Sequence, residues 1–345
     1  MSKLKPLVAK GKGKIAVILP DTVSSARYTE FDAPYLKEAF AKAGMSSSNV
    51  IIQNAQGSAS TQLTDAQSDI TNGASILIVD PLDSGTGAQI EKYASQHGAK
   101  VIDYDRLTLG GTRDYYVSFN NVQVGKLIGN GFASCVASEG VKNPNVIVMK
   151  GDPTDNNATL FAQGYLGVLK PKFSSGWKLA ATPAGTWDPP TATTEFQQAF
   201  TAHKGVNGVL VPNDANAAPI ITYLRHLKVK PNTFPVTGQD ASLVGLQNIL
   251  TGYQCGTAYK PIYLEAQAAA ALAIYTNAGQ TPPSGLVNGT TQDTKANTAV
   301  KSVLLKPEWV TVKNMTSTVI KDKFVPISQL CKGAFASACT KYGVK

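Results

Sequence analysis

Short apolar runs alternate with longer amphipathic segments along most of the chain. Runs such as ILIVD, NVIVM and GVLVP are apolar at nearly every position, which is typical of parallel strands that are covered on both faces. Runs of this kind predict strands at 14–19, 49–53, 75–80, 100–104, 115–119, 145–150, 177–181, 207–211, 234–237 and 254–259.

The segments between these runs have the period of an amphipathic helix. From Phe31 onward, Tyr35 and Phe40 fall on the same helical face, and Gly44 then provides a C-cap. Segments with this pattern predict helices at 31–43, 122–139, 157–170, 191–203, 216–227, 242–250 and 261–277.

This alternation of strand and helix fills two blocks, each long enough for its own doubly wound sheet. A loop rich in Gly, Pro, Thr and Asn at 279–298 and short strands near 303–305 and 309–312 follow the last helix. Because this remainder is too small for a third domain, we expect it to complete the first two. We predict an α/β fold with two Rossmann-like lobes, an N-terminal lobe of 14–119 with 261–290 and a C-terminal lobe of 120–258 with 299–315.

Composition and charge indicate a globular protein that is not built to bind nucleic acid. Of the 345 residues, 43% are apolar and 16% are charged, as in folded domains. The net charge of +9 is concentrated at the ends, because residues 1–14 carry five Lys and residues 301–345 carry eight Lys against two acids. The body between them is almost neutral and has no Arg-rich helix. We expect 1–13 to be a basic flexible tail.

The four cysteines and three histidines show no metal-ligand spacing, so we expect no metal site. Cys331 and Cys339 are close enough in the chain for a short loop or a helical turn to join them in a disulfide. Two unrelated buried thiols are the alternative, and the pairing of Cys135 and Cys255 stays open. A disulfide would indicate an oxidising, exported setting.

Polar side chains follow most of the predicted strands, where ligands bind in open α/β sheets. Carboxylate and amide oxygens can accept hydrogen bonds from sugar hydroxyls, Arg and Lys can donate to them, and aromatic rings can stack on a pyranose. This inventory predicts a site for a neutral polyol, although Asp and Asn after strands are also common turn and capping residues. The candidates are Arg27, Tyr28, Asp105, Arg106, Asp155, Asn157, Trp187, Asn213, Asp240 and Lys260.

A dinucleotide site is the alternative chemistry. Gly85-Thr86-Gly87 follows the run ILIVD and opens a predicted helix, and Asp105 lies about 20 residues further on. The third glycine of the fingerprint is missing, because Ile90 occupies its position. An NAD(P)-linked sugar oxidoreductase is therefore the second hypothesis, and no G-x-S-x-G or H-E-x-x-H motif suggests a hydrolase.

Short motifs along the chain match one family in order and spacing. They are KIAVILPD, SILIVDP, VIDYDR, YYVSFNN, GDPTDNNATLFAQG, VPNDANA, TGQDA, AYKPI and TVIKDKF. Over 14–327 the chain thus resembles the type I periplasmic sugar-binding proteins of ABC transporters, in particular those that bind D-xylose. The resemblance implies a periplasmic-binding-protein type I fold, with a three-strand hinge between the lobes and a sugar enclosed by them. Residues 316–345 would form a C-terminal extension near the hinge.

The resemblance also implies which side chains contact the sugar. Matching motifs assign this role to Arg27, Asp105, Arg106, Asp155, Asn157, Trp187, Asn213, Asp240 and Lys260. Tyr28 stands where the D-xylose-binding pattern has Trp, so we expect it to stack on the sugar opposite Trp187 in a pocket of altered volume. Repressors on the same core carry an N-terminal helix-turn-helix. We expect none here, because the first strand begins near Lys14.

These observations predict a non-enzymatic receptor of an ABC sugar importer. We expect it to bind a monosaccharide without a cofactor, D-xylose best and glucose more weakly, and to deliver it to a membrane permease. The ligand would favour a closed state, in which Arg27, Asp105 and Arg106 of one lobe and residues such as Asp155 and Asp240 of the other contact it together. We expect an exported monomer, periplasmic or attached to the cell surface, with no nucleic-acid partner.

Overall fold

The chain folds into two compact units in the computed structural model, which describes residues 1–345. It passes from one unit to the other after Asn120, Pro261 and Lys306, and Thr154–Asn157 is a brief return to the first unit. None of the helices combines the length and the apolar character that a membrane span requires. The first unit comprises Met1–Asn120, Thr154–Asn157 and Ile262–Lys306, and the second comprises Asn121–Pro153, Ala158–Pro261 and Pro307–Lys345.

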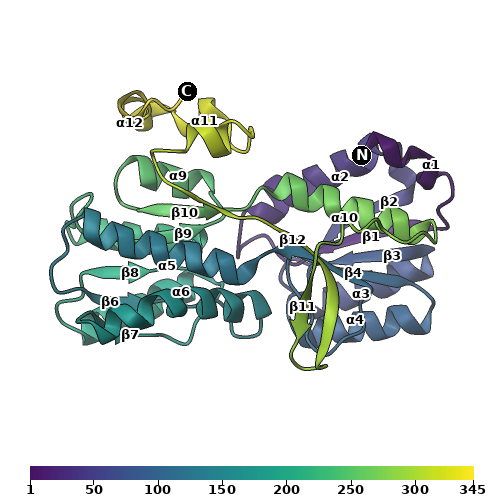
Figure 1. Cartoon of the computed structure of the whole chain (residues 1–345), viewed down its shortest axis with the longest axis horizontal. Coiled ribbons are helices and arrows are strands. Elements are labelled where there is room, and N and C mark those ends of the chain that lie inside the picture. Colours follow the sequence, from purple (N-terminus) through teal and green to yellow (C-terminus); the bar gives the residue numbers. More distant parts are fainter. The chain divides into compact units, whose positions relative to one another are not determined.

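The first unit is built on one seven-stranded sheet. Its strands are β1 (Lys14–Leu19), β2 (Val50–Asn54), β3 (Ala74–Val79), β4 (Lys100–Tyr104), β5 (Tyr115–Phe119), β11 (Gly289–Asp293) and β12 (Thr298–Leu305). Their order is β11-β12-β5-β4-β3-β1-β2, and only β11 and β12 are antiparallel to each other (Figure 1). The chain adds β2 on one side of β1 and β3 on the other, so the order of the strands reverses at β1. The loops after β1 and β3 therefore lead to opposite faces of the sheet and leave room between them for polar side chains.

Helices cover both faces of this sheet. They are α2 (Ala33–Lys42), α3 (Ala59–Thr71), α4 (Ser84–Gln96) and α10 (Ile262–Asn277). Figure 1 shows α2 and α10 on one face and α3 and α4 on the other. Phe40 and Leu272 belong to the apolar cluster on the first face, and Ala66 and Ile90 belong to the cluster on the second. The sheet is therefore buried on both sides, as its continuous apolar runs predict.

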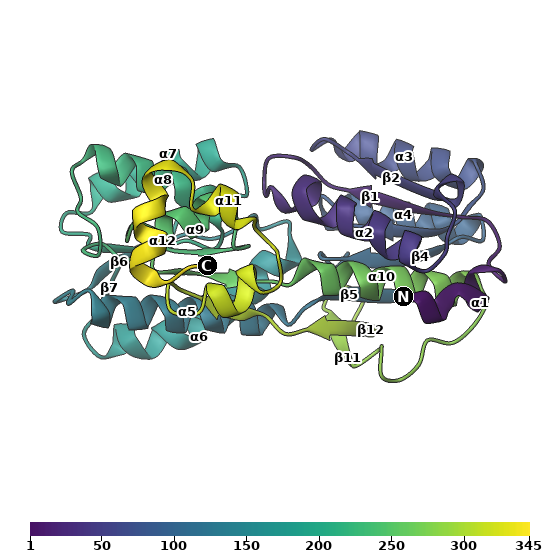
Figure 2. The same ribbon diagram turned by 90° about the horizontal axis from the view of Figure 1, so that it is seen from above.

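The N-terminal residues differ from the flexible tail that the sequence predicts. They include a short helix, α1 (Lys5–Val8), which lies beside α10 (Figure 2). Leu4, Leu7 and Val8 pack against the core of the first unit, and the backbone N–H of Lys12 donates to Asn277 Oδ1 at 3.0 Å. The high density of Lys hides these apolar positions, whose spacing of three and four residues suits a helix.

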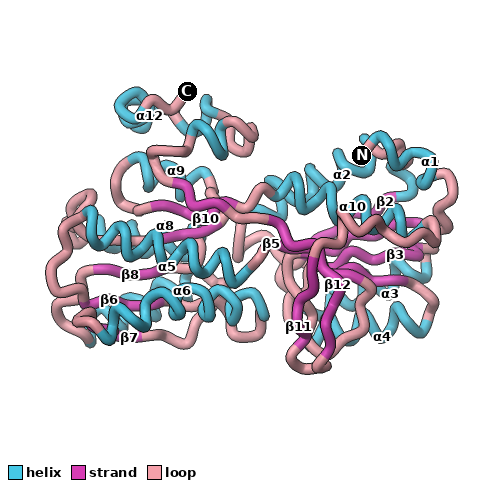
Figure 3. The backbone as a smooth tube through the Cα atoms, in the orientation of Figure 1, coloured by secondary structure: helices cyan, strands magenta, loops and turns pink.

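The second unit repeats the strand order of the first. Its strands are β6 (Asn145–Val148), β7 (Lys178–Ala181), β8 (Gly208–Leu210), β9 (Thr237–Gln239), β10 (Gly256–Tyr259) and β13 (Glu308–Val310). They form the ladders β7-β6-β8 and β9-β10-β13, which a parallel bridge between Val209 and Val236 connects. Figure 3 shows β6, β7 and β8 side by side. As in the first unit, the second strand in sequence lies at one edge, next to the first strand.

Helices also cover both faces of the second unit. They are α5 (Asn121–Ser138), α6 (Asn156–Ser174), α7 (Pro189–Ala202), α8 (Asp214–His226) and α9 (Leu243–Leu250). Phe196 of α7 and Ile220 of α8 pack in one cluster, while α5 and α6 run side by side on the opposite face (Figure 2). Glycine allows α5 and α6 to touch, because a Cβ on Gly125 would lie 2.1 Å from the backbone oxygen of Phe161.

The segment 279–298, expected to be a loop, contains a strand. β11 pairs with β12, and β12 lies beside β5 in the first sheet. Asp293 shapes the turn between them, since its Oδ1 accepts from the backbone N–H of Lys295 at 3.0 Å. The structure thus groups Thr298–Leu305 with the first unit, whereas the sequence-based boundaries put 299–315 in the C-terminal lobe. The polar sequence of β11 lacks the apolar run that reveals the other strands.

Two disulfides lie in the second unit, and no cysteine is free. Cys331–Cys339 closes the C-terminal extension between α11 (Ile327–Leu330) and α12 (Ala336–Tyr342), and both helices pack against α9. Cys135–Cys255, the pair that the sequence leaves open, joins α5 to the residue before β10.

Candidate functional site

A cluster of buried charges surrounds Arg27 in the first unit. Arg27 precedes η2 (Tyr28–Asp32), a π-helical turn that leads into α2. Its guanidinium donates to Asp32 through Nε and Nη2, both at 2.8 Å. It also donates to Asp105 through Nη1 and to Glu265 through Nη2, both at 2.7 Å. Although burial lowers it, the charges of these three carboxylates hold the pKa of Arg27 well above its usual value.

This geometry makes Arg27 mainly a positioning group. A guanidinium has five N–H bonds, and the ion pairs use all but one of them, on Nη1 next to Asp105. Glu265 comes from α10, and the hydroxyl of Tyr104 on β4 donates to Asp32. The network therefore ties β4, η2 and α10 together, and it holds the Asp105 carboxylate at the carboxyl end of the sheet.

Tyr28 lies within this network. Its side chain is 3% exposed and belongs to the core cluster, and both guanidinium groups lie near its ring, Arg27 at 5.5 Å and Arg106 at 5.7 Å from the centroid. Its hydroxyl donates to Asp105 Oδ2 at 3.4 Å and accepts from Arg106 Nη2 at 3.0 Å. The ring of Tyr28 therefore lies next to two guanidinium groups. The sequence instead predicts that this ring stacks on the sugar.

Asp105 and Arg106 follow β4 as the sequence predicts, and Asp80 follows β3. Asp105 has a left-handed backbone with φ of 56°, a strained conformation for a non-glycine residue. Asp80 Oδ1 lies 3.6 Å from Arg106 Nε, and neither oxygen of Asp80 accepts a hydrogen bond. Burial, followed by the charge of Asp105, raises the pKa of Asp80 well above its usual value. This carboxyl group is the least satisfied member of the cluster.

Asp155 and Asn157 group with the first unit, although they are expected to act from the second lobe. Asp155 Oδ2 lies 3.6 Å from Arg106 Nε. Asn157 Nδ2 donates to the backbone oxygen of Asp105 at 2.9 Å, and its Oδ1 accepts from the hydroxyl of Tyr116 at 3.2 Å. Asp155 Oδ1 also accepts from the N–H of Asn157 at 2.8 Å, which is a turn contact. The structure therefore gives both residues supporting roles around Asp105 and Arg106.

In the second unit, Asp240 and Lys260 form a pair at the ends of β9 and β10. The distance from Lys260 Nζ to Asp240 Oδ1 is 3.3 Å, and both side chains are buried. Asp240 has φ of 94°, again in the left-handed region, and its N–H donates to the backbone oxygen of Ala258 at 2.9 Å. A buried acid and a buried base in contact provide an acceptor and a donor of strong hydrogen bonds.

Asp214 holds the loop that carries Asp240. Its carboxylate accepts from Ser242 N at 2.8 Å, Gln254 Nε2 at 2.8 Å and Thr257 Oγ1 at 3.0 Å, so it holds the loop after Asp240 in place. Burial and then the charge of Asp240 raise the pKa of Asp214 to about 7, despite these hydrogen bonds. The sequence places Asp214 after a strand but does not reveal this role.

Trp187 and Asn213 complete the candidates of the second unit. Trp187 is half-buried and packs against Gly151, and its ring makes an edge contact with Phe161 at 6.4 Å between centroids. Asn213 caps α8, since its Oδ1 accepts from the N–H of Asn216 at 3.0 Å. Asn213 therefore has the capping role that the sequence leaves open, and Trp187 provides an aromatic surface.

Four buried acids outside the sequence-based candidates lie around these residues: Asp32, Asp80, Asp214 and Glu265. Asp80 could have been found, because it directly follows β3, but the predicted strand 75–80 includes it as the last strand residue. Glu265 lies in a nearly all-apolar helix, where one acid is a signal of a buried partner. Asp32 directly precedes a helix, and an acidic residue at that position indicates only a helix cap.

The Gly85-Thr86-Gly87 segment has a structural role. Asp83 caps α4 by accepting from the N–H of Thr86 at 2.9 Å, so a carboxylate occupies the place of a phosphate. A Cβ on Gly87 would lie 2.3 Å from Thr108 Oγ1, so this glycine permits close packing of α4.

Comparison with known protein families identifies the periplasmic binding proteins. The model of the periplasmic binding protein domain matches residues 15–281. The D-xylose-binding periplasmic protein of Escherichia coli strain K12 is 34% identical over 296 residues, which are 84% of this chain and 85% of that protein. The multiple sugar-binding periplasmic receptor ChvE of Rhizobium radiobacter is 28% identical over 341 residues, 94% of each chain.

Similar solved structures are also solute binding proteins of transporters. The carbohydrate transporter solute binding protein of Chloroflexus aurantiacus in complex with D-glucose has a TM-score of 0.80 and 26% identity, with 91% of this chain and 97% of that chain covered. The ABC transporter solute binding protein of Clostridium phytofermentans with bound β-D-glucose has a TM-score of 0.81 and 26% identity, with 92% and 99% covered.

Proposed function

Because the chain belongs to the periplasmic binding proteins, a family of non-enzymatic receptors, we propose that it binds a monosaccharide for the permease of an ABC importer. Because the family consists of non-enzymatic receptors, it argues against the NAD(P)-linked oxidoreductase, and Asp83 already accepts from the N-terminus of α4, where that enzyme would hold a phosphate.

One observation carries this proposal. Each unit has buried side chains of opposite charge at the carboxyl ends of its strands: Asp105 and Arg106 after β4 in the first unit, and Asp240 and Lys260 after β9 and β10 in the second. A neutral sugar presents hydroxyls that donate and accept, so paired acids and bases can bind it without leaving a net charge buried. Trp187 adds an apolar surface for the C–H face of a pyranose ring.

We propose D-xylose as the preferred sugar. Support comes from the relative that binds D-xylose by name and is 34% identical, whereas the similar solved structures that hold D-glucose are 26% identical. A hexopyranose carries one more CH2OH group than xylose. A pocket that fits xylose has to find room and a hydrogen-bond partner for that group, which weakens glucose binding.

We also propose that the two units close on the sugar and that the permease recognises the closed form. Candidate residues occur in both units, and three chain connections join them. A ligand that contacts both units favours the state in which all its contacts are made. The two disulfides and the periplasmic relatives support an exported protein.

Calorimetry with a panel of sugars tests the proposed ligand. We expect D-xylose to bind most tightly, D-glucose to bind measurably more weakly, and no sugar to be turned over when products are analysed. Tighter binding of glucose or of another hexose would overturn the assignment of xylose and leave the receptor in place. No binding of any pentose or hexose would overturn the sugar receptor itself.

A further inference from the structure

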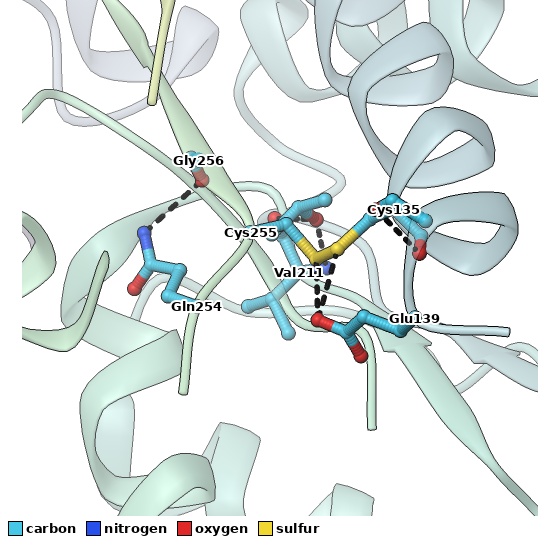
Figure 4. Close-up of a disulfide and its surroundings, with 8 residues drawn as sticks. Cys135, Glu139, Val211, Gln254, Cys255 and Gly256 are labelled. Atoms are coloured by element: carbon cyan, nitrogen blue, oxygen red, sulfur yellow. Dashed lines mark hydrogen bonds between the residues drawn. A yellow bond between two sulfur atoms is a disulfide. The ribbon is translucent and has the colours of Figure 1, made fainter. Parts of the chain in front are cut away.

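The disulfide Cys135–Cys255 lies in the second unit next to an acidic side chain. It joins the C-terminal part of α5 to the residue before β10, with 5.9 Å between the Cα atoms. Glu139 follows Cys135 by one helical turn, and its Oε1 lies 3.2 Å from Cys135 Sγ and 3.9 Å from Cys255 Sγ. Figure 4 shows the carboxyl group pointing at both sulfur atoms.

The contact between Glu139 and the sulfurs depends on a proton. A disulfide sulfur carries no hydrogen, so at this distance the only possible donor is the protonated carboxyl group of Glu139. The side chain of Glu139 forms no ion pair, and its Oε2 has no hydrogen-bond partner. Burial raises the pKa of Glu139 to about 7, so a large share of the molecules carry this proton near neutral pH.

Both cysteines and Glu139 line a cavity of about 440 Å³. Lys313 and Tyr342 are the other titratable groups in its lining, and neither forms an ion pair with Glu139. Cys255 is partly exposed, whereas Cys135 is 8% exposed. A small thiol in this cavity therefore reaches Cys255 Sγ more easily, and Cys135, beside Glu139, becomes the leaving sulfur.

We propose that Cys135–Cys255 is a thiol-exchange site for a dithiol reductant, at which Glu139 supplies the proton to the leaving sulfur of Cys135. The thiolate of the dithiol attacks Cys255 Sγ, the bond between the two protein sulfurs breaks, and Cys135 takes the proton of Glu139. The second thiol of the dithiol loses its proton to water and attacks the mixed disulfide. Cys255 leaves as a thiolate and is protonated by water, the dithiol becomes a cyclic disulfide, and water protonates Glu139 again.

The second disulfide of the same chain is a control within the molecule. Cys331 and Cys339 are also bonded, and they lie in the same unit, but no carboxyl oxygen forms a hydrogen bond or ion pair with their sulfurs. The two disulfides thus meet the same reductant under the same conditions, and only one has an acid in contact with it.

The test follows the reduction of each disulfide in the full chain by dithiothreitol, from about pH 5.5 to about pH 8.5. Differential alkylation and peptide mass mapping separate the two pairs. Thiolate attack alone raises the rate about tenfold per pH unit below the pKa of the reductant. We expect this slope for Cys331–Cys339 throughout, whereas the rate for Cys135–Cys255 levels off above about pH 7, where Glu139 loses its proton.

Two variants of the same type sharpen the result. Glu139→Gln keeps the shape but carries no transferable proton, so the plateau should disappear and the rate near pH 6 should fall by about tenfold or more. Glu308→Gln, an exposed position in the same unit, should leave both profiles unchanged. The proposal is overturned if Glu139→Gln has the native profile, if both disulfides show the same pH dependence, or if Cys135 and Cys255 are free thiols in the oxidised protein.

Discussion

At the scale of single residues, the candidate site combines side chains that we propose contact the sugar with side chains that hold them in place. Asp32 and Glu265 make no proposed sugar contact, yet they neutralise Arg27, and Arg27 in turn fixes Asp105. Asp214 does the same for the loop of Asp240. Burying these charges costs desolvation free energy, so each of them needs a partner of opposite charge. The partners hold the acceptors and donors rigidly in place, which reduces the entropy lost when a ligand binds.

Asp240→Asn tests the charged pair of the second unit. Asn keeps the side-chain shape and tolerates the left-handed backbone at φ of 94°, so the fold should persist. Loss of a charged hydrogen bond costs roughly 1.5–3 kcal/mol, which corresponds to about 10- to 150-fold weaker sugar binding. Calorimetry measures the affinity, and circular dichroism checks the fold. Asp65→Asn, on the outer helix α3, is the matched control and should bind as the native protein does; equal affinities for both variants would remove Asp240 from the site.

Asp214 makes stability depend on pH. Its pKa is raised to about 7 in the folded protein, so the folded state binds more protons than the unfolded state between about pH 4 and pH 7. The free energy of unfolding contributed by Asp214 is thus greatest below this window and falls as the pH rises through it. We expect Asp214→Asn to show a smaller decrease in unfolding free energy from about pH 5 to about pH 7.5 than the native protein, measured in urea. An unchanged decrease would mean that Asp214 titrates normally.

At the scale of elements, the two units have the same strand order and place their candidate residues in equivalent loops. Both wind their strands outward from the first strand, and both place loops with acidic residues at the carboxyl ends of central strands. Regular elements position these loops, and glycines decide how closely elements approach. Gly125 allows α5 to contact α6, and Gly151 allows Trp187 to pack over the loop after β6.

Gly151→Ala tests how the loop after β6 places Trp187. A Cβ on Gly151 would lie 2.1 Å from Trp187 Cζ2, so the ring has to move. We expect sugar affinity to fall by about tenfold or more with intact secondary structure, because a displaced ring loses its stacking contact. Gly167→Ala in α6 is the control, since nothing lies within 4 Å of that Cβ, and its affinity should stay native. Native affinity for Gly151→Ala would show that Trp187 does not need its present position.

At the scale of the whole molecule, the chain connections between the two units bear on the proposed closure. The chain leaves and re-enters the units at widely separated points, so neither unit is one continuous stretch of sequence. Each unit has its own sheet and core, so the closure that we propose would unfold neither of them.

Small-angle X-ray scattering tests the proposed closure. We expect saturating D-xylose to decrease the radius of gyration of the native protein, since the closed state is favoured by ligand contacts with both units. Asp240→Asn should show the decrease only at correspondingly higher sugar concentration. An unchanged radius of gyration in the native protein, with binding proven by calorimetry, would leave a receptor that does not close.

The sequence by itself determined most of the strands of the two sheets, with β11 as an exception in a segment that it predicts to be a loop. β1, β4 and β5 have the predicted bounds, because a parallel strand covered on both faces needs consecutive apolar residues. The same pattern predicts the two-unit α/β fold. It also predicts that Asp105, Arg106 and Asp240 follow strands, because a polar residue after an apolar run indicates that the strand ends and a loop begins.

Only the tertiary structure decided which distant residues meet. Nothing local tells that Glu265 pairs with Arg27, that Asp155 and Asn157 group with the first unit, or that Cys135 bonds to Cys255. These contacts join residues far apart in the chain, and each forms because burial demands a partner that only the packing of the elements can bring near. Local pattern therefore fixes the elements, while the partners of buried charges and cysteines are set by how those elements pack.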